Sequence, residues 1–240
     1  MKTLDITFFD TSRSRNIPVC IYLPKGTGAI LPVVIFNPGY WSQESLANTN
    51  LSPAYKNYTY LAEFFTSKNY AFISIQHDIL GDNDGLETID PTASQHEARE
   101  HLWIRGVKNI FFVLEELKQK FPQFELEKFI IAGHSNGGDI AKYFAGLHHE
   151  KISSVIALDG RRCRIAPLVP MKLLMFEAWD TSTDIGVIPD EGTRENPKRA
   201  NLEYVIIKPK NALHMSYADE LVTEDIKRVI YRGIEWFLEI

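Results

Sequence analysis

The sequence predicts an α/β protein with a mostly parallel central sheet of about eight strands and helices on both faces. Short apolar runs rich in β-branched residues alternate with longer segments whose apolar residues recur at helical spacing, which is typical of βαβ units. Several of the apolar runs have no polar face, as strands covered on both sides require. The 240 residues contain no repeat, low-complexity tract or linker. We therefore expect a single domain over residues 1–240.

Eight segments have the pattern of strands. The first two alternate apolar and polar residues and are joined by the polar turn 10–16, so we expect them to pair antiparallel. The two arginines of this turn, Arg13 and Arg15, are interpreted as part of a solvated loop. The predicted strands cover residues 3–9, 17–23, 32–36, 70–75, 128–132, 153–158, 171–176 and 204–207.

Four segments have helical periodicity, and the segments between them are interpreted as loops. The predicted helices cover residues 58–68, 95–120, the residues after the 133–137 turn to about 147, and 219–238. Residues 42–58 and 185–201 are expected to be irregular, and 79–95 is the best candidate for a flexible rim or small lid. No segment between strands is long enough for a large cap domain. The acids of the 79–95 region lack the spacing of a calcium loop, so they are interpreted as solvated; they are Asp78, Asp82, Asp84 and Asp90.

Composition excludes some classes of function. The net charge is −5 and the isoelectric point is near 5.8, which disfavours a nucleic-acid surface. The start of the chain has no basic region followed by an apolar one, and no apolar run approaches a membrane span. We expect a cytoplasmic protein without stable membrane insertion, in which Cys20 and Cys163 are free thiols. The oligomeric state is not predicted.

A G-x-S-x-G motif stands between a predicted strand and a predicted helix. It reads Gly133-His134-Ser135-Asn136-Gly137. At such a strand-to-helix turn the backbone is strained and the serine hydroxyl projects above the end of the sheet. Glycines are needed on both sides because side chains there would crowd the neighbouring strand and helix. Motif and context together resemble an α/β-hydrolase, with Ser135 as the nucleophile.

A serine nucleophile needs a histidine to take its proton and a carboxylate to orient that histidine. In the α/β-hydrolase fold the order along the chain is serine, acid, histidine. His214 is the only histidine after residue 149, and it follows the last predicted strand, where the base is expected. Three acids are candidates: Asp159 after one strand, Asp180 after the next, and Asp184 four residues further on.

The loop after the strand at 32–36 is expected to supply one backbone N–H of an oxyanion hole, and Asn136 the other. The loop reads Asn37-Pro38-Gly39-Tyr40-Trp41. Proline has no N–H, so Gly39 or Tyr40 must donate, and we favour Tyr40. Trp41 and His134 are candidate walls of a substrate pocket.

The remaining histidines are given structural roles. His77 ends a strand and can line the site, but a hydrogen-bonded structural histidine is favoured. His148-His149-Glu150 is interpreted as the surface end of a helix, since adjacent histidines point in different directions. His96 and His101 lack metal-ligand spacing, and no metal or cofactor is expected.

From about residue 5 to 220 the chain resembles the branch of α/β-hydrolases that includes platelet-activating-factor acetylhydrolases. The resemblance is carried by Arg13-x-Arg15-x-Ile17-Pro18-Val19, Pro32-Val33-Val34-Ile35, Arg105 with Phe112-Val113-Leu114, Gly133-His134-Ser135-x-Gly137-Gly138, Ala157-Leu158-Asp159 and His214-x-x-Tyr217-Ala218-Asp219. In that branch the acid follows the strand after the nucleophile helix. The resemblance therefore implies Asp159 as the acid, before Asp180.

These residues together predict a serine hydrolase that cleaves small carboxylic esters through an acyl-enzyme. The triad does not choose the leaving group, so a peptidase or a thioesterase is an alternative. A non-catalytic protein that uses the same fold as a ligand pocket is a further alternative.

Overall fold

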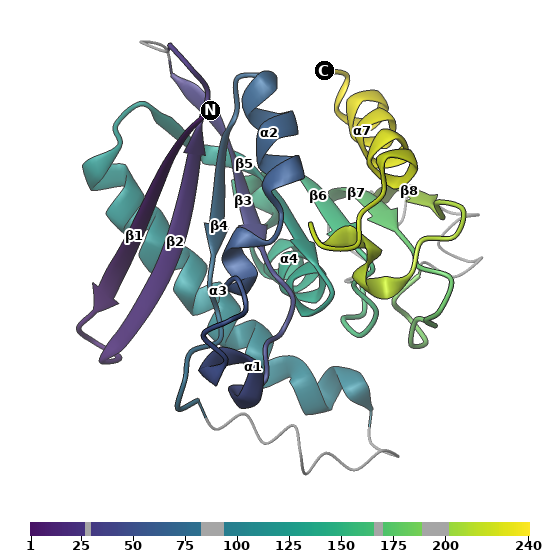
Figure 1. Ribbon diagram of the computed structural model, residues 1–240, viewed down its shortest axis with the longest axis horizontal. Helices are drawn as coiled ribbons and strands as arrows, with labels where there is room; N and C mark the ends of the chain where they lie inside the picture. The colour runs from purple at the N-terminus through teal and green to yellow at the C-terminus, as the bar shows by residue number, and fades with distance from the viewer. Residues whose placement is uncertain (27–29, 83–93, 166–169, 189–201) are drawn as a thin grey trace.

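The computed structural model describes residues 1–26, 30–82, 94–165, 170–188 and 202–240. Its eight strands form one sheet in the order β1-β2-β4-β3-β5-β6-β7-β8 (Figure 1). β1 pairs antiparallel with β2 and β2 with β4, while all the other neighbours are parallel. The strands are β1 (Lys2–Asp10), β2 (Arg15–Leu23), β3 (Leu31–Asn37), β4 (Ala71–Ile75), β5 (Phe124–His134), β6 (Ile152–Leu158), β7 (Met171–Phe176) and β8 (Leu202–Ile207). The predicted mostly parallel sheet of about eight strands is confirmed.

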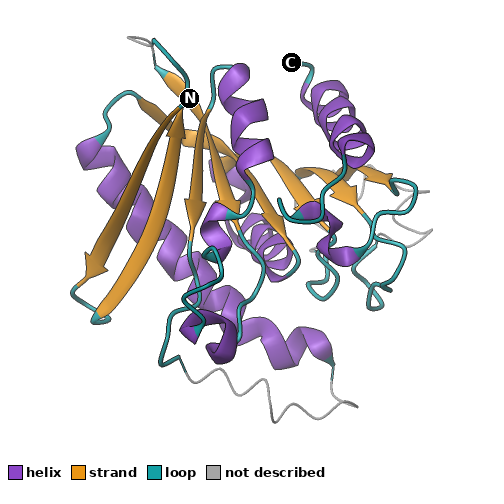
Figure 2. Cartoon of the chain, viewed as in Figure 1, coloured by secondary structure: helices purple, strands orange, loops and turns teal. Residues whose placement is uncertain are grey.

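Helices cover both faces of the sheet. The buried side chains of α3 and α4 pack in one apolar cluster and those of α2 and α7 in another, and Figure 2 shows the two pairs on opposite sides of the strands. The helices are α1 (Gln43–Ala47), α2 (Thr59–Ser67), α3 (Gln95–Lys120), α4 (Asn136–His148) and α7 (Glu224–Leu238), with 3-10 turns η1 (Ala54–Lys56), η3 (His149–Lys151) and η4 (His214–Tyr217).

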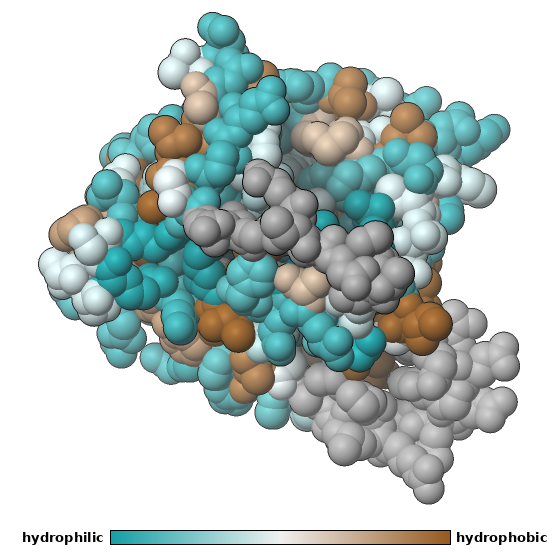
Figure 3. All heavy atoms as spheres, turned by 90° about the horizontal axis from the view of Figure 1, so that it is seen from below, coloured by the Kyte–Doolittle hydropathy of each residue, from teal (hydrophilic) through white to brown (hydrophobic). Residues whose placement is uncertain are grey.

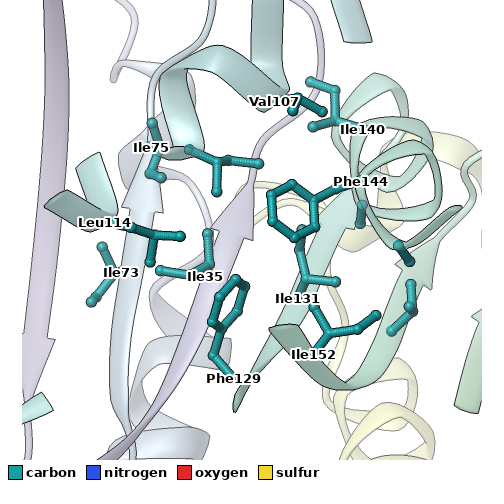
Figure 4. Packing of buried hydrophobic residues seen from close by; sticks show 14 of the residues in the cluster. Ile35, Ile73, Ile75, Val107, Leu114, Phe129, Ile131, Ile140, Phe144 and Ile152 are labelled. Atoms are coloured by element: carbon teal, nitrogen blue, oxygen red, sulfur yellow. The ribbon is translucent and has the colours of Figure 1, made fainter. Parts of the chain in front are cut away.

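The core explains why the central strands have no polar face. Successive strand residues point to opposite sides, so Ile35 packs in the cluster under α3 and α4, and Phe36 in the cluster under α2 and α7. Figure 4 shows Ile35 and Ile131 of the sheet beside Leu114 of α3 and Phe144 of α4. Because helices cover both faces of the central strands, the residues on both faces must be apolar.

The largest differences from the predicted elements are two additional short helices and the starts of α7 and β5. Residues 42–58, predicted as a loop, contain α1 and η1. The five residues of α1 include no buried one, so the sequence there shows no helical spacing of apolar residues. α7 begins at Glu224 rather than 219, where the Thr223 side chain accepts from the Ile226 N–H at 3.4 Å. β5 begins at Phe124, four residues earlier than predicted, because its exposed charged residues hide the strand pattern.

The interpretation of Arg15, Asp78 and Asp82 as solvated residues is wrong. Arg15 Nη1 lies 2.6 Å from Asp82 Oδ1, and Arg105 Nη2 lies 2.5 Å from Asp78 Oδ1. The side chain of Asp78 is only 3% exposed, and burying a carboxylate requires such a partner. Arg13 is also anchored, at 2.8 Å from Asn109 Oδ1. Most of the proposed lid, and the acids 84 and 90, lie outside the described residues, as do residues 189–201.

His77 is a buried structural histidine, as the sequence favours. The Asn37 amide donates to the Ala132 carbonyl at 2.8 Å, so its Oδ1 accepts from His77 Nε2–H, also at 2.8 Å. His77 Nδ1 then accepts from the Asn109 amide at 3.3 Å. Burial, with the charges of Arg105 and Arg15, lowers the pKa of His77 to about 3.

We expect this histidine to make the fold sensitive to mild acid. In the unfolded chain its pKa is near 6.5, so below that pH the unfolded state binds a proton that the folded state excludes. The contribution of His77 to the free energy of unfolding is therefore fully present above pH 6.5 and falls as the pH is lowered. The expected loss from His77 is about 2 kcal/mol between pH 7.5 and pH 5. Urea unfolding at both pH values should show this loss in the wild type and a smaller one in His77→Gln. An equal pH dependence of the two proteins would contradict the prediction.

The remaining expectations concern cysteines, membranes and metals. Cys20 and Cys163 are free and buried. Within the described ranges, no helix has the length and apolarity to cross a bilayer. The same ranges hold no group of three or more histidine, cysteine or acidic side chains that could bind a metal ion.

Candidate active site

Ser135 stands at a sharp turn between β5, which ends at His134, and α4, which begins at Asn136. Its backbone angles, φ 54° and ψ −124°, are strained for a residue with a side chain. A Cβ on Gly133 would lie 2.2 Å from the Gly137 carbonyl oxygen, and one on Gly137 would lie 1.9 Å from the Asn37 carbonyl oxygen. The two glycines of the motif are therefore required for this approach of strand, helix and loop.

Three of the predicted residues form one chain of hydrogen bonds. His214 Nε2 lies 2.9 Å from Ser135 Oγ, and His214 Nδ1 bonds to Asp159 Oδ2. They come from three elements: the β5–α4 turn, the loop after β6, and the turn η4 after β8. The C-terminal ends of parallel strands meet at one edge of the sheet, and this brings residues 135, 159 and 214 together.

Asp159 is held as a carboxylate that faces the histidine ring. It is 3% exposed, and it accepts from the Ala178 N–H at 2.9 Å and from the Thr181 hydroxyl at 3.0 Å. Burial alone would raise its pKa, but the bonds from His214, Ala178 and Thr181 and the charge of His214 outweigh burial and lower it. Sequence reasoning missed Thr181, since nothing in the pattern marks a loop threonine as the partner of a distant acid.

The alternative acids occupy other positions. Asp180 lies beside the site, but its Oδ1 accepts from the backbone N–H of His214 at 2.7 Å and not from the ring. Asp184 forms an ion pair with Arg162. Of the three acids, Asp159 alone bonds to an imidazole nitrogen of His214 in the described structure.

The loop after β3 lies against the serine. A Cβ on Gly39 would be 3.4 Å from the Ser135 Cβ. The Gly39 N–H points to the Tyr58 hydroxyl at 3.4 Å, and the Trp41 N–H donates to Asp78 Oδ2 at 2.9 Å. The loop is therefore fixed on both sides of Tyr40. Asn136 is the first residue of α4, and the N–H of a first helical residue has no acceptor within its helix.

Trp41 lines a groove of about 470 Å³ next to this loop. Its walls combine apolar side chains with a few polar ones, and include Leu46, Tyr55, Asp78 and Ile79. A groove of this size suits part of a small ligand. The residues that line this groove include none of Ser135, Asp159 and His214, so the place of Trp41 in the wall of a substrate pocket stays a prediction.

His134 does not have the predicted position. It is 2% exposed and both of its ring nitrogens are engaged, so it presents no ring nitrogen to a substrate. The His214 carbonyl can only accept, so His134 Nε2 carries the proton that it donates at 2.8 Å. His134 Nδ1 then accepts from the Tyr58 hydroxyl at 2.8 Å. Burial and the neighbouring His214 lower the pKa of His134 to about 3, so it is neutral at physiological pH.

Through His134, Tyr58 therefore joins the turn η4, which carries His214, to the loop after β3. Its hydroxyl donates to His134, which holds the backbone of His214, and it accepts from Gly39. It stands just before α2, and no sequence signal distinguishes it from other core tyrosines. The tilted contact of its ring with Phe36, with centroids 4.5 Å apart, keeps it in place.

For the ester hydrolysis that the sequence predicts, we expect Tyr58→Phe to lower kcat about tenfold with little change in KM, because the substitution removes the two hydrogen bonds that fix both loops. Stopped-flow or steady-state assays would measure this effect. Tyr60→Phe is the matched control: its hydroxyl bonds to the Tyr217 carbonyl at 3.0 Å, so a fall in kcat of the same size in both variants would indicate a general loss of stability instead.

The comparisons with known proteins concern the fold. No protein-family model matches the sequence, and no curated protein matches it significantly. An alpha-beta serine hydrolase homologue from Coxiella burnetii is 17% identical with a TM-score of 0.59, and the match covers 98% of both chains. An a/b serine hydrolase without lid from Xanthomonas campestris is 14% identical with a TM-score of 0.57, covering 98% of this chain and 95% of that one.

A third similar structure is named for a different activity. It is the dienelactone hydrolase-like promiscuous phosphotriesterase P91 from metagenomic libraries, which is 13% identical with a TM-score of 0.64, covering 99% of this chain and 98% of that one. At these identities the likeness concerns the arrangement of the chain alone. The eight-stranded, mostly parallel sheet and its helices have the α/β-hydrolase fold, the fold of these serine hydrolases.

Proposed function

We propose that this protein is a serine hydrolase that cleaves small carboxylic esters, with Ser135, His214 and Asp159 as its catalytic triad. The observation that carries the proposal is the continuous chain from Ser135 Oγ through both nitrogens of His214 to Asp159. A hydroxyl is a weak nucleophile at neutral pH unless a positioned base takes its proton. Here the base is in contact and its orienting acid is buried behind it.

In the proposed reaction, Ser135 Oγ attacks the acyl carbonyl as His214 Nε2 takes the hydroxyl proton. Asp159 stabilises the imidazolium that forms and keeps the ring in the tautomer that exposes Nε2 to the serine. His214 then gives the proton to the leaving alcohol oxygen, which releases the alcohol and leaves an acyl-serine. Water, deprotonated by His214, attacks this ester and frees the acid.

Tyr40 and Asn136 are the proposed donors to the oxyanion. The anchored positions of Gly39 and Trp41 on either side of Tyr40 support this assignment, as does the place of Asn136 at the start of α4. The α4 N-terminus also carries a partial positive charge. Two N–H groups fixed before the reaction stabilise the developing charge without reorganisation.

The sequence supports three further parts of the proposal: the identity of the acid, the location of the protein and a reaction without a cofactor. The resemblance to platelet-activating-factor acetylhydrolases supports Asp159 as the acid, and the sequence supports a cytoplasmic location and a reaction without a cofactor. A peptidase or a thioesterase uses the same triad. An ester demands less from the triad than an amide, because an alcohol is a better leaving group than an amine. A thiol leaves more readily still, so the triad alone does not separate an esterase from a thioesterase, and the substrate panel below does.

Hydrolysis of 4-nitrophenyl esters from acetate to octanoate, beside a matched thioester and a matched anilide, tests the proposal. We expect turnover of the esters well above the buffer rate, with the shorter chains preferred. No ester turnover, or a higher kcat/KM for the thioester or the anilide after correction for intrinsic reactivity, would contradict it.

A further inference from the structure

Two arginines flank the candidate site. Among the described residues Arg99 has no acidic partner, and Arg161 has only a long contact with Asp159. Arg99 lies on the first turns of α3, and Arg161 on the loop after β6. Figure 1 shows the start of α3 at the lower side of the molecule, towards which β4 to β7 point. Figure 3 views the same side directly, and most of the surface that it colours there is hydrophilic, with separate apolar patches.

The helix places Arg99 next to the nucleophile turn. Trp103 lies four residues later and thus on the same face of α3, and its indole N–H donates to Asn136 Oδ1 at 3.0 Å. Arg99 is half-buried. Burial lowers its pKa, the charges of Arg162 and Arg161 lower it further, and Asp139 and Tyr40 oppose them. Arg99 is therefore close to the loop after β3 and to the loop after β6, and it stays charged.

The carboxylates around these arginines are already committed. Asp159 bonds to His214, Asp184 pairs with Arg162, and Asp139 lies 3.2 Å from the buried ammonium of Lys142. Arg161 Nε is 3.6 Å from Asp159 Oδ2, which is an ion-pair distance but longer than a hydrogen bond.

In the described part of the chain, Arg99 contacts no carboxylate; its one polar partner is neutral, Gln95 Oε1 at 3.3 Å. A half-buried guanidinium without an anion carries a desolvation cost, which a bound anion would remove. The protein has a net charge of −5, so an excess of cations at this place is a local feature.

We propose that the substrate of this site is an ester that carries a carboxylate, bound between Arg99 and Arg161 while its carbonyl lies at Ser135. The inference rests on the proposed hydrolase function and adds the charge of the substrate. A guanidinium binds a carboxylate through two parallel N–H bonds, so two arginines can fix both the position and the direction of such a group.

Two matched pairs of esters test the proposal. In 4-nitrophenyl monoadipate and 4-nitrophenyl hexanoate the acyl chains differ by a terminal carboxylate; in 4-acetoxybenzoate and 4-methylphenyl acetate the alcohols do. After correction for spontaneous hydrolysis, we expect the wild-type kcat/KM to be at least tenfold higher for the anionic ester than for the neutral one in one of the two pairs. The pair that shows this preference tells whether the carboxylate lies on the acyl or on the alcohol side of the ester. Arg99→Gln and Arg161→Gln should each lower this ratio about 10- to 100-fold.

Controls separate the charge of the site from stability. Arg228→Gln changes an exposed arginine of α7 that pairs with Asp225 at 3.1 Å, and it should leave the ratio unchanged. Arg99→Lys keeps the positive charge but lacks the planar guanidinium, and it should give a ratio of kcat/KM values between those of the wild type and Arg99→Gln. Melting curves show whether each variant folds; should Arg99→Gln fail to fold, Arg161→Gln and Arg99→Lys decide.

The outcomes distinguish the two proposals. Hydrolysis of the neutral esters with no preference for the anion in either pair contradicts the carboxylate site and leaves the hydrolase proposal standing. The carboxylate site is also contradicted if Arg99→Gln and Arg161→Gln lower kcat/KM for both members of a pair by one factor. Hydrolysis of none of the four esters contradicts both proposals.

Discussion

Ser135→Ala is expected to lower kcat for ester hydrolysis about 10⁶-fold, to a rate near that left by binding and the oxyanion hole alone. In the proposed reaction Ser135 Oγ forms the acyl-enzyme, and the substitution removes this atom together with its bond to His214 Nε2. The Ser135 side chain does not cap α4, so the variant should fold. Alanine has a Cβ like serine, so the strain at φ 54° is unchanged.

Pre-steady-state assays should show a burst of one 4-nitrophenolate per wild-type active site and none from Ser135→Ala. Ser154→Ala is a suitable control, because Ser154 is a buried serine of β6 with no place in the site. A variant Ser135→Ala that keeps more than about one hundredth of the wild-type rate would show that another group performs the chemistry.

Asp159→Asn is expected to lower kcat about 10⁴-fold, because an amide can hold the imidazole in the wrong tautomer and cannot stabilise the imidazolium. Asparagine tolerates the left-handed backbone that Asp159 adopts, with φ 46°. The fold should therefore survive, although the bonds from Ala178 and Thr181 will be weaker.

Asp180→Asn is the matched comparison. Asp180 accepts from the His214 backbone N–H, and the amide oxygen of asparagine can accept that bond as well, so we expect a loss of less than about tenfold. Rates measured side by side at pH 8 decide between the acids. A loss in Asp180→Asn as large as that in Asp159→Asn, or a near wild-type rate in Asp159→Asn, would refute the assignment.

The sequence is sufficient to predict the sharp turn at Ser135 and the approach of His214 to it. The glycines around Ser135 reflect a local steric demand, which a motif can encode. The order of strands then leaves His214 as the one histidine that can reach the serine from a later loop. The acid is harder to predict, since Asp159 and Asp180 end neighbouring parallel strands at one edge, and geometry decides which of them meets the ring and which the backbone.

Contacts between distant segments that no motif marks could not be predicted. Tyr58 and Thr181 meet their partners 76 and 22 residues away along the chain, and no local pattern indicates such a pair. The solvated interpretation of Asp78 failed for the same reason, because its partner Arg105 lies on a separate element, the helix α3. Likewise, helical periodicity shows the face of α3 that carries Arg99 but not which loops approach that face.

Labelling with a fluorophosphonate probe tests the central claim most directly, because it requires an activated serine and no knowledge of the substrate. Intact-mass and peptide mass spectrometry should find one adduct per wild-type molecule, on Ser135, formed far more slowly in His214→Ala and not at all in Ser135→Ala. An adduct on another residue, or equally fast labelling of the wild type and His214→Ala, would contradict the assignment of Ser135 as a nucleophile activated by His214.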